Sequence, residues 1–192
     1  MKRGFTLIEL LAVITIIGIL VGIIIGVAGN VRKKAAVSRA KAEISAIELA
    51  LERYKIDNAD YPTGTAISIP TGANSFYAGS PTSGGYVSAS QALFNALCGR
   101  ANYSALAGAG DTIYLEVREG QVGNSSGSAN SYLQDPFGFA YGYVYDPSGS
   151  PKSYYNEVVP DIWSTSGETT NPNSGTNNYI YLRWVTNWGS GR

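Results

Sequence analysis

The sequence predicts an α+β fold in which one long N-terminal α-helix packs on a small antiparallel β-sheet. Apolar residues dominate the first 51 positions, and beyond Asn30 they recur at helical spacing. After Pro62 the chain changes to short apolar and aromatic runs divided by Gly, Ser, Asn and Pro. At 192 residues the chain has room for one domain plus an appendage, which a globular domain and a long helix would fill.

The first part of the helix is a predicted membrane span. Residues 10–28 carry no charge, and about 20 apolar residues are enough to cross a bilayer as a helix. The alternative is a cleavable secretory signal, with Lys2 and Arg3 as its basic start and residues 26–28 as its cleavage site. Because the apolar run exceeds the roughly 7–15 residues of an ordinary signal, the pattern favours a transmembrane segment over 5–29. Basic residues flank both ends, so the positive-inside rule leaves the orientation open.

The helical pattern continues beyond this span. A stripe of apolar residues spaced 7, 3, 4 and 3 apart marks one face of a helix: Val37, Ile44, Ile47, Leu51 and Tyr54. No proline precedes Pro62, so residues 5 to about 56 are predicted to form one helix, with its amphipathic half over 30–57.

Two features of the span point to association with other chains. A carboxylate at bilayer depth costs about 2.5–3.5 kcal/mol on insertion scales, so Glu9 requires a partner. Gly18, Gly22 and Gly26 fall four residues apart on one helix face, where small residues let neighbouring helices approach closely.

Residues 58–192 are predicted to form the globular domain. Residues 88–99 have the capping serine, apolar positions and final glycine of a short helix. Aromatic and β-branched runs predict strands at 112–117, 140–146 and 178–185. An antiparallel sheet packed on the amphipathic helix is the expected arrangement. The thirteen tyrosines after residue 57 are assigned to strand packing and subunit contacts.

Composition argues against catalysis. The chain has no histidine, the commonest general base and a member of the usual triads. No spacing marks a catalytic pair among the carboxylates of Asp135, Asp146, Asp161 and Glu168. Turn chemistry explains the Asp-Pro steps at 135 and 146, and Cys98 is expected to be a small buried hydrophobe.

Charge divides unevenly along the chain. Residues 1–57 carry nine Lys/Arg and five Asp/Glu, whereas residues 58–192 carry five and nine. The net charges are therefore +4 and −4, which sum to zero. No basic stripe is interleaved with aromatic residues, so no nucleic-acid partner is expected.

The N-terminal sequence KRGFTLIELLAVITIIGIL resembles the type III signal of prepilin-like proteins. That signal joins a basic leader, a Gly-Phe junction, a glutamate and an apolar span in fixed register. The resemblance implies a leader at 1–4, cleavage by the prepilin peptidase between Gly4 and Phe5, and N-methylation of Phe5. It also implies a single-pass inner-membrane protein whose C-terminal domain lies in the periplasm.

Later segments resemble the major pseudopilin family of bacterial type II secretion systems. They are ALERYKIDNADYPTG, QDPFGFAYGYVYDPSG, DIWSTSG and the final TNW, in the order found in that family. The resemblance implies a pilin-like fold and a structural subunit of a periplasmic pseudopilus. The implied partners are further copies of the chain in a helical filament, minor pseudopilins and an inner-membrane assembly platform. Gly26 replaces the usual proline, and residues 65–133 are longer than the corresponding family region.

Two other functions remain open. One is a type IV pilus subunit for adhesion, motility or DNA uptake, and the other is a membrane-tethered extracytoplasmic binding module. A type IV pilus subunit would share the assembly helix, whereas a binding module would use the helix only as an anchor.

In a filament, the resemblance gives Glu9 a partner. Cleavage after Gly4 would give Phe5 a new amino group, and opposite charges attract strongly where the dielectric constant is low. Glu9 of an incoming subunit would then pair with the Phe5 amine of its neighbour.

The resemblance also suggests a structural calcium ion, because the oxygen-rich loop 164–178 lies where major pseudopilins bind calcium. Its candidate ligands are Ser166, Glu168 and Asn171, and oxygen ligands suit calcium. Only Glu168 among them carries a charge, so a plain solvated loop is the alternative. No other cofactor is expected.

Overall fold

The computed structural model describes residues 6–65, 84–105, 111–124, 130–148, 155–156, 158–167 and 184–188. For 23–29, 65 and 84–85 it describes the backbone alone. The chain divides into two compact units, Met1–Ala36 and Val37–Arg192.

Helix α1 runs from Leu7 to Asn58, which confirms the long helix predicted for residues 5 to about 56. The helix has no internal proline. The residue after the helix, Ala59, has a φ of +67°, which is the left-handed conformation that commonly terminates helices.

Within the part of the chain that the structure describes, no helix is both long enough and apolar enough to cross a bilayer. The predicted span at 5–29 includes residue 5 and the side chains of 23–29, which lie outside the described residues. The membrane anchor therefore stays a prediction.

The predicted stripe on α1 is confirmed in the second unit. Ile44, Ile47 and Leu51 are each at most 3% exposed, and Val37 and Tyr54 pack against the same core. The helix thus supplies one wall of the core, as its apolar spacing predicted.

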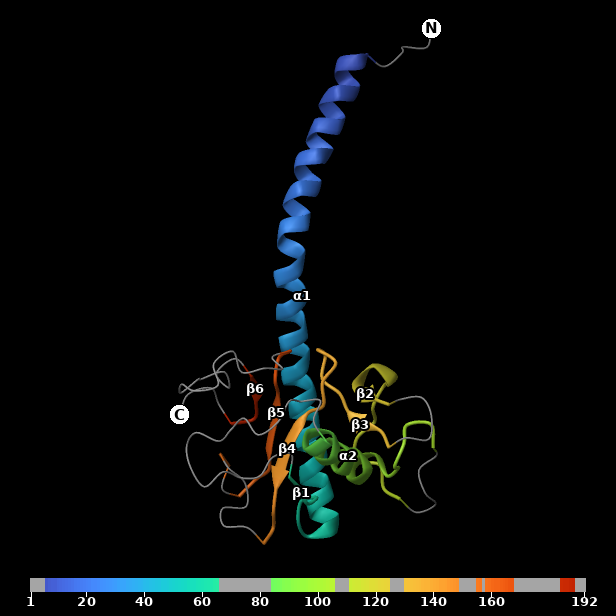
Figure 1. Ribbon diagram of the computed structural model, residues 1–192, viewed down its shortest axis with the longest axis vertical. Coiled ribbons are helices and arrows are strands. Elements are labelled where there is room, and N and C mark those ends of the chain that lie inside the picture. The colour runs from blue at the N-terminus through green and yellow to red at the C-terminus, as the bar shows by residue number, and fades with distance from the viewer. Residues whose placement is uncertain are drawn as a thin grey trace. The chain divides into compact units, whose positions relative to one another are not determined.

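The second unit is built around antiparallel strands (Figure 1). The larger sheet has the order β1-β4-β5-β6, and its strands are Gly64–Thr65, Gly142–Tyr145, Asp161–Ser164 and Val185–Thr186. The smaller sheet pairs β2 (Val122–Gly123) with β3 (Tyr132–Leu133), and the 3₁₀ helix η1 (Glu119–Gln121) precedes it. The α+β, pilin-like fold class is therefore confirmed.

Helix α2 runs from Gly84 to Cys98, so it begins four residues before the predicted start at 88. It packs against β1, β3 and β4 (Figure 1). Leu93, Phe94 and Leu97 are fully buried on its inner face. Gly99, with a φ of +62°, ends the helix as predicted.

The strand predicted at 112–117 is wrong. This segment belongs to no strand, because the N–H groups of Tyr114 and Leu115 both donate to the Leu97 carbonyl at the end of α2, at 2.8 and 2.9 Å. The run at 140–146 is confirmed as β4, although the strand is shorter. Residues 178–183 lie outside the described residues, and β6 begins at Val185.

Cys98 is 1% exposed, as expected of a small core residue. Burial raises the pKa of its thiol to about 12, so the thiol stays protonated and unreactive near neutral pH.

We expect Gly142→Ala to lower the free energy of unfolding by about 1–3 kcal/mol. A Cβ at Gly142 would overlap with Cε2 of the buried Trp163 ring, so the strand or the ring must move. Gly120→Ala is the matched control, since no described atom lies within 4 Å of its Cβ position. Urea unfolding followed by tryptophan fluorescence measures the free energy of unfolding of both variants. An equal loss in the two variants would contradict the close packing at Gly142.

Candidate functional site

The first helical turn is closed by a capping box. The Thr6 N–H and hydroxyl both donate to Glu9 Oε2, at 2.8 and 2.7 Å, and the Glu9 N–H donates weakly to Thr6 Oγ1 at 3.4 Å. This is the Thr-x-x-Glu pattern that caps helix N-termini. Glu9 therefore has a local partner that the sequence analysis missed, although residues 6–9 spell the pattern. Gly4 and Phe5 lie outside the described residues, so the pairing of Glu9 with the Phe5 amine stays a prediction.

The first part of α1, from Leu7 to Val21, presents apolar side chains on all sides. Eleven large apolar residues are each 48–82% exposed: Leu7, Ile8, Leu10, Leu11, Val13, Ile14, Ile16, Ile17, Ile19, Leu20 and Val21. Contiguous apolar surface of this kind is typical of a segment that contacts lipid or other protein chains.

The predicted glycine face is open where it is described. A Cβ added at Gly18 or Gly22 would meet no atom within 4 Å. The face around these two glycines is therefore free for another helix to approach. The side-chain surroundings of Gly26 lie outside the described residues.

The Tyr-x-x-Asp-Asn-x-x-Tyr-Pro segment ends α1 and fastens it to its surroundings. Asn58 Nδ2 donates to the Tyr54 carbonyl at 2.9 Å. Asp57 Oδ2 accepts the hydroxyl of Tyr114 at 3.0 Å, and the Tyr61 hydroxyl donates to Glu52 Oε1 at 2.6 Å. These side chains serve the helix end rather than a reaction.

Asp135 is the buried acceptor of a tight turn. Its Oδ1 accepts the N–H groups of Phe137 and Phe139 at 3.0 and 2.9 Å, and its Oδ2 accepts the Ser164 hydroxyl at 2.5 Å. Burial raises the pKa of Asp135, and the hydrogen bonds from Ser164 and the two N–H groups act against that rise. The turn role predicted for the Asp-Pro steps is confirmed here and at Asp146, which accepts the Ser148 N–H at 2.9 Å.

The final Thr-Asn-Trp segment closes the sheet. Asn187 Oδ1 accepts the Ile162 N–H at 3.0 Å, and Asn187 Nδ2 donates to the Pro160 carbonyl at 2.8 Å. Trp188 stacks on Tyr155 with ring centroids 4.4 Å apart. This second resembling segment is thus also structural.

The candidate calcium loop is described only at its start. Ser166 is 5% exposed with a φ of +56°, and its hydroxyl and that of Thr165 are buried without a hydrogen-bond partner among the described residues. Glu168 and Asn171 lie outside those residues. Over the described ranges, no three His, Cys, Asp or Glu side chains gather closely enough to hold a metal ion.

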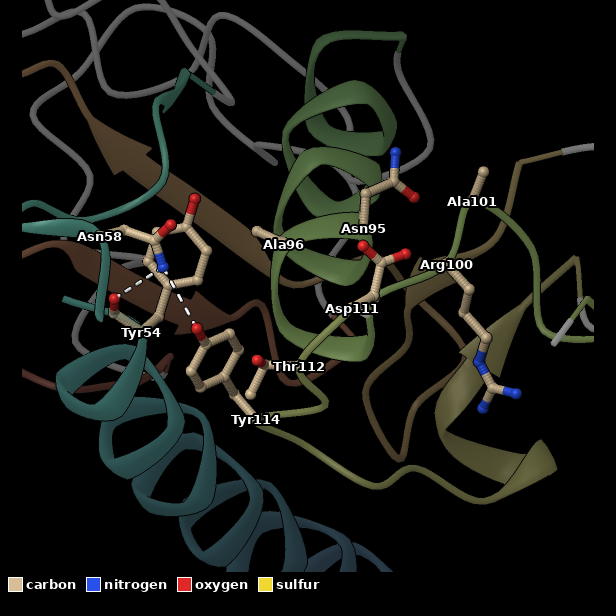
Figure 2. Close-up of a pocket in the computed structure, with 10 residues that line it drawn as sticks. Tyr54, Asn58, Asn95, Ala96, Arg100, Ala101, Asp111, Thr112 and Tyr114 are labelled. Atoms are coloured by element: carbon tan, nitrogen blue, oxygen red, sulfur yellow. Dashed lines mark hydrogen bonds between the residues drawn. The ribbon is translucent and has the colours of Figure 1, made fainter. Parts of the chain in front are cut away.

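A cavity of about 500 Å³ opens between the ends of the two helices and the segment that follows α2 (Figure 2). Tyr54 and Asn58 line it from α1, and Asp111, Thr112 and Tyr114 line it from the segment. The sequence analysis did not predict this pocket because its walls come from three separate parts of the chain.

Comparison with known proteins identifies the N-terminal region. Residues 1–25 match the prokaryotic N-terminal methylation motif, and residues 27–92 match the protein G family of the type II secretion system. Residues 1–92 are therefore similar to the N-terminal region of type II secretion pseudopilins. This confirms the predicted resemblance for this region.

Individual relatives agree with the family match. The type II secretion system core protein G of Escherichia coli K12 is 46% identical over 63 residues, which are 32% of this chain and 43% of that protein. The protein of the same name from Dickeya chrysanthemi is 40% identical over 76 residues, 36% of this chain and 49% of its own length. The protein of the same name from Pseudomonas aeruginosa is 43% identical over 62 residues, which are 32% of this chain and 44% of that protein.

The chain therefore spans less than half the length of these pseudopilins. No solved structure gives a significant match. The pseudopilin assignment rests on the N-terminal region, and the rest of the chain is interpreted from its own contacts.

We expect Thr6→Ala to loosen the first turn of α1 by about 1 kcal/mol, because it removes the cap. Amide hydrogen exchange at Ile8 to Leu10 should quicken by about fivefold. Thr15→Ala is the control, since the Thr15 hydroxyl only donates to the Leu11 carbonyl inside the helix, at 2.8 Å. If the two variants exchange alike, the capping box has no energetic role.

Proposed function

We propose that this chain is a structural subunit of a periplasmic pseudopilus and drives type II protein secretion by polymerising. The observation that carries the proposal is the contiguous match of residues 1–92 to the methylation motif and then to the protein G family. The exposed apolar surface of the first helical turns supports it, because such a surface needs lipid or other chains to cover it.

Processing prepares the subunit for assembly. The prepilin peptidase removes residues 1–4, and methylation follows on the new amino group of Phe5. Before assembly the helix is anchored in the inner membrane, with residues 58–192 in the periplasm. The assembly platform and minor pseudopilins then bring subunits together.

Glu9 sets the register between subunits in this proposal. Among the described residues, its exposed carboxylate accepts hydrogen bonds from Thr6 alone, so an incoming positive charge competes with Thr6 for that carboxylate. The Phe5 amine of a neighbouring subunit supplies that charge, and pairing neutralises both groups in the filament core. Gly18, Gly22 and Gly26 let the helices approach closely enough for the pairing.

The described carboxylates support a structural role over an enzymatic one. Asp135 and Asp161 are both buried and accept backbone N–H groups, Asp161 from Tyr155 and Asn156 at 2.7 and 2.9 Å. Their oxygens stabilise turns, which is a structural role.

Glu9→Gln should abolish filament formation while the protein stays in the membrane fraction. The amide keeps the shape of the side chain but loses the charge that attracts the neighbouring amine. Glu48→Gln removes a carboxylate elsewhere on α1 and should assemble normally. Sheared filaments quantified by immunoblot, with membrane fractionation, measure the effect, and normal filaments from Glu9→Gln would refute the charge pairing.

Mass spectrometry of the mature N-terminus tests the processing step directly. The proposed function requires a chain that begins at N-methylated Phe5. A chain that begins at Gly29 would instead establish an ordinary secretory signal and exclude the pseudopilus.

We also propose that calcium orders the 164–178 loop. The described residues fit a calcium ion in part, because the buried hydroxyl oxygens of Thr165 and Ser166 have no hydrogen-bond partner among the described residues. Ser166 with Glu168 and Asn171 would hold the ion, which would order the loop.

Calcium added to EDTA-treated protein should raise the melting temperature by about 2–4 °C for each kcal/mol of binding free energy. Ser166→Ala should reduce that rise, whereas Ser148→Ala, in an exposed turn, should leave it unchanged. A melting temperature that does not respond to calcium would count against the site.

A further inference from the structure

One wall of the cavity between the helix ends is formed where the segment from Asp111 packs against the end of α2. Gly99 has a φ of +62°, and a Cβ on it would lie 3.1 Å from Cβ of Asp111 and 3.3 Å from the Thr112 carbonyl oxygen. Glycine therefore lets the segment from Asp111 pass close to the end of α2. The two N–H bonds to the Leu97 carbonyl then fix that segment in place.

The electrostatics of this cavity favour a cation. The C-terminal end of a helix carries partial negative charge, and here α2 ends at the cavity wall. Asp111 adds a full negative charge; it is exposed and has no hydrogen-bond or ion-pair partner among the described residues. Asn58 and Asn95 contribute amide groups to the lining.

The one basic residue in the lining does not neutralise the site. Figure 2 shows the Arg100 side chain running away from Asp111 and Asn95. Its guanidinium lies 5.0 Å from the ring centroid of Tyr103, and its Nη1 donates to the Ala105 carbonyl at 3.3 Å.

Aromatic rings complete the arrangement. Tyr54 and Tyr114 form an edge-to-face pair with centroids 5.3 Å apart, and both are half-buried and line the cavity (Figure 2). Aromatic faces attract ammonium and guanidinium groups. A free carboxylate, a helix C-terminus and two tyrosine rings together match the chemistry of a lysine or arginine side chain.

The chain itself carries a surplus of such side chains. Arg39 is paired with Glu43 at 2.7 Å, and Lys55 contacts Tyr61. Five other basic residues of α1 are exposed and have no hydrogen bond or ion pair with any described residue: Arg32, Lys33, Lys34, Lys41 and Arg53. Once residues 1–4 are removed, the side chains of residues 5–57 comprise seven Lys/Arg and five Asp/Glu, a surplus of +2 that is opposite in sign to the −4 of residues 58–192.

We propose that this cavity binds a basic side chain from α1 of a second copy of this chain. The contact joins two different surfaces, so it is heterologous, and heterologous contacts that do not close into a ring build open helical filaments. The inference rests on the proposed function and adds to it a contact between subunits outside the N-terminal helix bundle.

The test uses the full-length chain in cells that assemble wild-type filaments. Asp111→Lys should lower the yield of sheared filaments by about tenfold or more, because a cation in the cavity repels the incoming one. Glu116→Lys is the matched control, since Glu116 is equally exposed and five residues away and has no partner among the described residues. It should change the yield by less than about twofold.

The partner is found by charge reversal. Each of the five basic residues is changed to Glu in the Asp111→Lys background, and one of these second changes should restore filaments. Circular dichroism confirms that each variant folds. If Asp111→Lys does not fold, Asp111→Asn, which keeps the shape, should lower the yield instead.

Normal filaments from every folded Asp111 variant would overturn the proposal. A second combination of results would also overturn it. In that case none of the five charge reversals restores filaments, while spermidine raises the melting temperature of the wild-type chain and Asp111→Lys abolishes this rise. The cavity would then bind a free amine and not a second copy of the chain. Failure of the pseudopilus function is a separate result, since wild-type cells would then show no filaments at all.

Discussion

Three tyrosine hydroxyls on one face of β4 hold the sheet to α1 and the turn after it. Tyr141 donates to Glu43 Oε2 at 2.7 Å, Tyr143 donates to the Pro62 carbonyl at 2.6 Å, and Tyr145 donates to Asp60 Oδ1. Alternate residues of a strand share a face, so the three rings enter the core together. Burial raises the pKa of each hydroxyl, so all three remain protonated donors in the physiological range.

These three tyrosine hydrogen bonds explain the residue types in and around β4. Glu43 also accepts Gln121 Nε2 at 3.1 Å and Arg39, so the carboxylate that receives Tyr141 links α1 to η1 as well. On the opposite face of β4, Gly142 leaves room for the ring of Trp163. Along residues 141–145 tyrosine alternates with Gly142 and Val144, so one face carries long side chains with polar tips and the other carries smaller apolar residues.

The features set by local spacing could be predicted from the sequence, and those set by long-range contacts could not. The stripe of α1 and the stop at Gly99 follow from helix periodicity and backbone preference, which neighbouring residues determine. Residues 112–117 have the composition of a strand, but the Leu97 carbonyl takes the N–H groups that a sheet would need. The strand Asp161–Ser164 was missed because four residues show little periodicity, and its pairing with β4 comes from distant chain.

The candidate functional residues also divide into those that local sequence indicates and those that it does not. Glu9 could be singled out because a charge is unusual in an apolar run, yet its capping partner Thr6, three residues earlier, was overlooked. The cavity at Asp111 had no sequence signal, since its lining converges from residues more than 50 positions apart. The family matches cover residues 1–92, so Asp111, Thr112 and Tyr114 of the lining lie outside them.

In the proposed filament, the contacts between subunits would be made by surfaces that the core does not use. The second unit satisfies its buried carboxylates with its own N–H and hydroxyl groups, so substitutions there act first on folding. Glu9 and Asp111 differ because both carboxylates are exposed, so another chain can reach them. In the proposed filament, a cation from another chain would pair with each carboxylate and exclude water, and this pairing is what would make the two residues determinants of polymerisation.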